Sequence, residues 1–155
     1  MRTSRLEAFS DGVLAIIITI MVLELHVPDG PRLADLADSA TGFLTYLLSF
    51  VYIGIYWNNH HHLFQLVGRI DGGVLWANLH LLFWLSLYPF TTAWMDETDL
   101  ARTPLVVYGV NLLAAALAYY VLVLAQYNVK ATGHVAKLRK DLALNNADEE
   151  PHNGA

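Results

Sequence analysis

The stretch TPLVVYGVNLLAAALAYYVLVLAQYNV, residues 103–129, contains no Asp, Glu, Lys or Arg. A helix needs about 20 predominantly apolar residues to cross the hydrocarbon core of a bilayer, so this segment is long enough to span a membrane. Two further uncharged runs have apolar parts of similar character, at residues 40–57 and 72–95. The sequence therefore predicts an all-α integral membrane protein.

The overall composition supports this class. Of the 155 residues, 55% are hydrophobic and 15% are charged, whereas a soluble domain carries about 25% charged residues. The length allows one domain, and the net charge of −5 argues against duplex nucleic acid as a partner. The sequence has no cysteine, which excludes disulfides, thiolate metal sites and cysteine nucleophiles.

The N-terminal apolar run, GVLAIIITIMVL at residues 12–23, is too short to span alone and needs its polar flanks near the membrane surface or against protein. A cleaved signal peptide is the competing interpretation, because Arg2 and Arg5 precede the run. Glu7 and Asp11 interrupt that approach, and no small-residue cleavage site follows. We predict four membrane spans, at about residues 8–25, 40–58, 72–95 and 104–128.

Basic residues in the segments outside the spans alternate between the two sides of the membrane. They lie before the first span, between the second and third, and after the fourth, while the other two loops are mainly acidic. By the positive-inside rule this predicts cytoplasmic termini. Residues 1–129 would form the transmembrane domain and residues 130–155 a polar cytoplasmic tail, with a short amphipathic helix near residues 135–144.

Polar residues lie within or beside the predicted spans, where they are costly unless they face protein or water. Ser10 and Asp11 could cap a helix start or join a buried polar network. Arg5 and Asp11 are six residues apart and cannot pair along one helix face, so each would bind a neighbouring helix. The remaining candidates are Thr19, Glu24, Asn58, Asn59, His60, His61, His62, Asn78, His80 and Asn111.

A stripe on the first helix has a second interpretation. Ile16, Ile20 and Leu23 are four and three residues apart and share one face, with Thr19 beside it. Several copies around an axis would form apolar rings that gate by dewetting. On spacing alone a lipid-facing or packed surface is favoured.

Enzymatic and metal chemistry have no support in the motifs. The consecutive histidines 60–62 would point about 100° apart on a helix, so they cannot converge on one ion. GxSxG, HExxH and a phosphate-binding glycine loop are missing from the sequence, as is the TVGYG potassium filter. We expect no enzymatic activity and no cofactor, and any ion path would be built from side chains.

Three motifs follow one another over the first 92 residues. They read Arg5-x3-Phe9-Ser10-Asp11-Gly12-Val13-x-Ala15-Ile16-x2-Thr19 up to Leu23-Glu24-Leu25, then Tyr56-Trp57-x2-His60-His61-x-Leu63-Phe64, then Asn78-Leu79-x2-Leu82-Phe83 with Pro89-Phe90-x-Thr92. Together they resemble the transmembrane protein 175 family, which are potassium channels of lysosomes and, as single-repeat homologues, of bacteria and archaea.

The resemblance implies passive, leak-type potassium permeation through a homotetramer in a prokaryotic cell membrane, with the first helix lining the pore. By position, Ile16 would form the narrowest ring, with Thr19, Ile20 and Leu23 further toward the outside. The resemblance also implies a structural polar network made by Arg5, Phe9, Ser10, Asp11, Trp57, His61 and Asn78.

Two other functions stay open, one from a departure from the family and one from the histidines. Family repeats have six helices and this chain supports four, so a non-conducting membrane subunit that needs a partner protein is one alternative. A histidine-dependent, proton-linked carrier around His60, His61 and His80 is the other.

Overall fold

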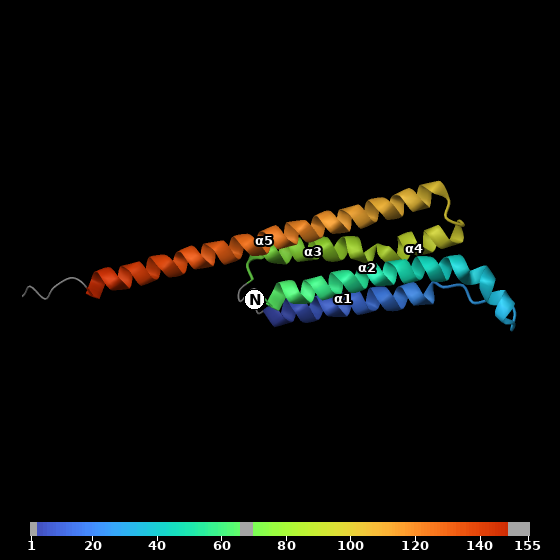
Figure 1. Ribbon diagram of the computed structural model, residues 1–155, viewed down its shortest axis with the longest axis horizontal. Helices are drawn as coiled ribbons and strands as arrows, with labels where there is room; N and C mark the ends of the chain where they lie inside the picture. The colour runs from blue at the N-terminus through green and yellow to red at the C-terminus, as the bar shows by residue number, and fades with distance from the viewer. Residues whose placement is uncertain (1–2, 66–69, 149–155) are drawn as a thin grey trace, which may run out of the picture.

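The computed structural model describes residues 3–65 and 70–148 of the chain. Within these ranges the protein is helical and contains no β-strand. The elements are α1 (Thr3–Leu23), the 3-10 helix η1 (Leu33–Ser39), α2 (Ala40–Gln65), α3 (Gly72–Ser86), α4 (Tyr88–Glu97) and α5 (Arg102–Asp148). The long helices run side by side, and α3 and α4 lie nearly end to end (Figure 1).

The prediction of an all-α protein with four spans is confirmed. Four helical segments are long and apolar enough to cross a membrane, and α3 and α4 together form the third of them. The described chain begins at one end of the bundle and ends beyond that same end, as an even number of spans requires (Figure 1). The cytoplasmic location of that end stays a prediction.

The third span, predicted at residues 72–95, consists of two helices rather than one. Pro89 lies in the first turn of α4; in one continuous helix it would lack the N–H for a helical bond, and its ring would clash with the carbonyl of Leu85. The helix is therefore interrupted at Leu87, whose N–H donates to the Trp84 carbonyl oxygen at 3.3 Å. Proline in the first turn of the new helix costs little, so α4 starts at once.

The helix that contains the fourth predicted span does not end near residue 129, while the bounds of the span itself stay a prediction. Helix α5 continues through the expected polar tail to Asp148 and projects far beyond the other helices (Figure 1). The added segment is rich in Ala, Leu and Lys, which favour helix, and its single glycine, Gly133, is tolerated.

The helices pack with α1 and α5 on opposite sides of the bundle. Helix α1 contacts α2, α3 and α4, while α5 packs mainly on α3 and also on α4. Small side chains, including the fully buried Ala115 and Ala118 of α5, allow close approach of the helices, as is common in membrane bundles. The core is completed by Leu14, Ile17, Met21, Ile53, Leu81, Leu85 and Leu122.

Candidate functional site

Helix α1 has one face buried in the bundle and one face left open. The buried face is formed by Leu6, Ser10, Leu14, Ile17 and Met21. The open face carries the predicted stripe: Ile16 is 58% exposed and Leu23 80% exposed, and Thr19 and Ile20 are also exposed. Among the described residues the other helices pack mainly on the buried face of α1, and Ile20 also lines a surface hollow with Pro89 and Phe90 of α4.

A chain of buried hydrogen bonds joins α1, α2 and α3 behind this stripe. Asn78 of α3 donates from Nδ2 to Ser10 Oγ at 3.0 Å, and Ser10 donates to the Leu6 carbonyl oxygen at 2.9 Å. The Asn78 oxygen lies 2.7 Å from Nε2 of His60 on α2. Because that oxygen only accepts, His60 must carry a proton on Nε2.

A second set of contacts ties α1 to α2 at the N-terminal end of α1. Trp57 Nε1 donates to Asp11 Oδ1 at 3.0 Å, and His61 Nδ1 lies 2.7 Å from Glu7 Oε1. Gln65 Nε2 is 2.8 Å from the other His61 nitrogen. With the Gln65 amide donating to Nε2, the Nδ1 atom of His61 is the donor to Glu7. The Trp57 and His61 rings are also stacked, 16° from parallel.

The structure brings together five of the seven residues that the resemblance placed in a polar network: Ser10, Asp11, Trp57, His61 and Asn78. They form two adjacent sets rather than one. Arg5 and Phe9 instead lie exposed on α1, and no ion pair in the described residues joins Arg5 to Asp11.

The alternative interpretation of Ser10 and Asp11 as helix caps is wrong. Helix α1 begins at Thr3, so both residues lie two turns inside it. Their side chains accept hydrogen bonds from Asn78 and Trp57 on other helices instead of from free backbone amides at a helix start.

Sequence reasoning missed Glu7 as a network member, although its spacing contained a signal. Glu7 and Asp11 are one helical turn apart, and so are Trp57 and His61. Two antiparallel helices bring such pairs into register, with Glu7 on His61 and Asp11 on Trp57. The match was visible in the sequence only once these two helices were known to be neighbours.

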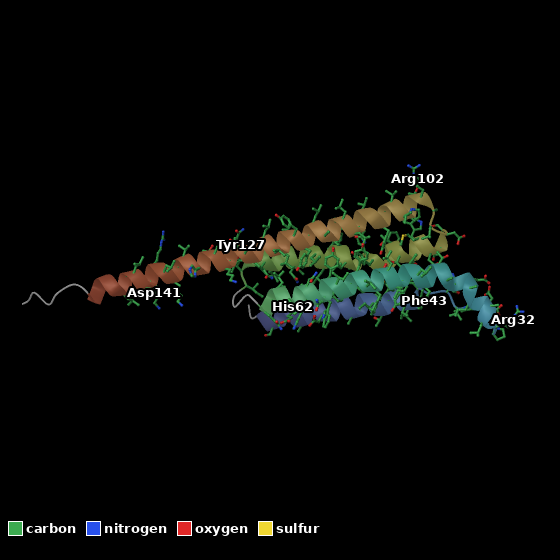
Figure 2. The ribbon with its side chains drawn as sticks, viewed as in Figure 1. Arg32, Phe43, His62, Arg102, Tyr127 and Asp141 are labelled. Atoms are coloured by element: carbon green, nitrogen blue, oxygen red, sulfur yellow. The ribbon has the colours of Figure 1, made fainter. Side chains whose placement is uncertain are left out.

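The three consecutive histidines diverge, as their helical spacing predicts. His60 points into the bundle toward Asn78, and His61 turns to Glu7. His62 is exposed at the end of α2 (Figure 2). Among the described residues no three histidine or carboxylate side chains are grouped to hold a metal ion.

A separate polar cluster joins α2, α4 and α5 nearer the other end of the bundle. Ser49 lies 2.7 Å from the Thr92 hydroxyl and 3.0 Å from the Tyr108 hydroxyl. Asn111 donates to Thr91 across a longer distance of 3.4 Å. These bonds hold α4 and α5 in place, because they join α2 to α4, α2 to α5 and α5 to α4.

A sequence profile of the endosomal/lysosomal potassium channel TMEM175 family matches residues 5–89, the segment that holds α1 and both sets of network contacts. The chain belongs to the TMEM175 family. A relative from Chryseobacterium, named a potassium channel, is 54% identical over 90% of this chain and 72% of its own length.

Other TMEM175 relatives extend the likeness to the fold. A potassium channel of Streptomyces collinus is 35% identical over 90% of this chain and 70% of its own. The crystal structure of a lysosomal potassium-selective channel TMEM175 homologue from Chamaesiphon minutus superposes with a TM-score of 0.69 at 34% identity. That alignment covers 92% of this chain and 79% of the other. The chain is thus an integral membrane protein with the TMEM175 fold.

Proposed function

We propose that this protein is a potassium channel that conducts K⁺ passively through a pore lined by α1 of a homotetramer in a prokaryotic membrane. The observation that carries the proposal is the open face of α1, where Ile16, Thr19, Ile20 and Leu23 are all exposed while the opposite face is buried. The relatives named as potassium channels support the choice of ion.

The composition of the open face favours a pore over a simple lipid contact. Along with the apolar stripe it carries Arg5 and Thr19, both exposed. A basic side chain on one line with apolar rings suits a water-filled path better than lipid. The Thr19 hydroxyl is satisfied by the Ile16 carbonyl at 2.9 Å, so it adds no unpaired donor to the constriction.

The polar network would hold this face in position. A constriction made of single side chains discriminates ions only if its radius is fixed, and that requires the helix behind it to be supported. Helix α3 supports α1 through the hydrogen bond to Ser10, and α2 supports it through the hydrogen bond to Asp11. In this mechanism Ile16 sets the narrowest ring, and the network residues act as positioning residues.

Ion flux through the purified protein in liposomes tests the proposal. We expect K⁺ efflux that exceeds Na⁺ efflux under matched gradients, with none from empty liposomes. Absence of flux together with a monomeric mass in a native mass measurement would favour the non-conducting subunit.

An Ile16→Asn variant tests the role of the constriction. The amide is polar and would wet an apolar ring, so the barrier that discriminates between ions should fall. We expect at least a several-fold loss of K⁺ over Na⁺ preference with flux maintained or raised. Leu113→Asn, on the exposed face of α5, is the control and should keep the preference. An unchanged preference in Ile16→Asn would remove Ile16 from the proposed pore.

A further inference from the structure

Helix α5 gathers the basic residues of the chain where it leaves the bundle. Four of the nine Lys and Arg residues, including all three lysines, lie between residues 130 and 140. Tyr127 marks the level at which α5 passes the end of the bundle (Figure 2). These cations therefore begin within one turn of the level at which the helix leaves the bundle.

The cations near this point share one side of α5. Tyr127, Lys130, His134 and Lys137 are spaced by three, four and three residues, which places them on one face of a helix. Together with Ala131 and Gly133 they form one open surface of the projecting helix. All four side chains are exposed, Tyr127 by 70%, and no ion pair among the described residues uses either lysine.

This basic face is continuous with the surface of α5 that faces lipid. Leu113, Leu117, Tyr120, Leu124 and Tyr127 are all exposed and repeat every three to four residues down the span. The bundle holds the opposite side of the helix, through Ala115, Ala118 and Leu122. A phospholipid with its acyl chain along the apolar stripe would thus place its phosphate near Tyr127 and Lys130.

Acidic and basic side chains lie on different sides of α5 at this level. Asp71, the acidic residue directly before α3, lines a hollow with Asn128 and Thr132 on another side of α5. Asp141 follows one turn beyond Lys137, further from the membrane. An anion at the level of Lys130 therefore meets cations without an adjacent carboxylate.

We propose that Tyr127, Lys130, His134 and Lys137 form a binding site for the phosphate of an anionic phospholipid in the leaflet at this end of the bundle. The lysines supply charge, and each basic residue near an anionic surface strengthens binding substantially. Tyr127 supplies the amphipathic ring that favours the headgroup level. The proposal depends on membrane insertion and not on ion conduction, so the two can fail separately.

Lipid binding to the full chain in neutral detergent tests the site. Native mass spectrometry during titration with phosphatidylglycerol or phosphatidylcholine of matched acyl chains gives the affinity for each. We expect tighter binding of phosphatidylglycerol, weakened by salt because exposed charges are screened. Equal affinity for the two lipids would overturn the proposal. So would inorganic phosphate alone that displaces the lipid at equimolar concentration, since the site would then recognise the free ion.

A matched pair of variants separates this site from general attraction by basic charge. Lys130→Gln should weaken phosphatidylglycerol binding about fivefold, the effect of one basic residue at the membrane surface. Arg139→Gln removes the same charge from the opposite face, nine residues further on, and should change binding less than about twofold. Both residues are exposed, so neither change is expected to disturb folding. Equal losses in the two variants would contradict a site on the Lys130 face.

Discussion

Asn78 is the residue through which three helices are joined. Its amide group contacts Ser10 of α1 on one side and His60 of α2 on the other, and all three side chains are buried. An amide can serve both neighbours because it donates and accepts at once. A buried donor that loses its partner keeps its desolvation cost, so this position is sensitive to any apolar replacement.

We expect Asn78→Leu to lower the free energy of unfolding by about 1–2 kcal/mol, the upper range for hydrogen bonds between membrane helices. His60 would lose its acceptor in the interior. Thermal unfolding in detergent measures the change, and Asn59→Leu, at an exposed position on α2, is the control, with a shift within about 0.5 kcal/mol. The double variant Asn78→Leu/His60→Phe should recover part of the loss, because both partners are then apolar. A loss no larger than that of Asn59→Leu would contradict a role for this bridge.

At the scale of the elements, α2 and α4 approach closely at the end of the bundle opposite the network. Gly42 is buried in the first turns of α2, and a Cβ atom placed there would collide with the Asp96 carboxylate of α4. Asp96 also lies 3.8 Å from Nδ1 of His26, which follows α1. A glycine at this one position thus lets a carboxylate sit between three segments.

Gly42→Ala is expected to destabilise the protein by about 1 kcal/mol or more, because the Asp96 side chain must leave its place. Gly54 lies on the same helix, and a Cβ atom placed there would have no neighbouring atom within 4 Å. Gly54→Ala should therefore stabilise by about 0.5–1 kcal/mol through helix propensity. Unfolding in detergent measures the change in the free energy of unfolding for each variant. Adding Asp96→Ala to Gly42→Ala should remove the destabilisation. A stabilising Gly42→Ala would show that the carboxylate moves freely.

At the scale of the whole molecule, the positions of α1 and α5 determine how copies could assemble. They lie on opposite sides of the bundle, so copies arranged with α1 at a central axis would carry α5 at the rim. That arrangement covers the open stripe of α1 and leaves the apolar face of α5 in lipid. It also places the basic end of α5 beside the surrounding leaflet.

Because the chain has no cysteine, single cysteines report this arrangement cleanly. We expect Leu23→Cys to give covalent dimers with a short bifunctional maleimide, since one cysteine per chain joins chains in pairs, and native mass to show four chains. Leu113→Cys, on the exposed face of α5, should remain monomeric on denaturing gels. Cross-linking at residue 113 and none at residue 23 would place α5 at the axis and exclude the proposed pore.

The sequence by itself determined the class, the number of spans and the apolar stripe of α1, because these depend on hydrophobicity and spacing along one segment. The i, i+4 pairs of Glu7 with Asp11 and Trp57 with His61 were also present in it. Only the tertiary structure decided which polar groups meet, since a buried side chain takes the partner that packing brings to it. Packing also left Arg5 and Phe9 on the open face of α1, outside the network in which they were expected. Pro89 ended α3 and started α4, with the break at Leu87. Helix propensity extended α5 to Asp148, so one continuous helix takes the place of the separate short helix expected near residues 135–144.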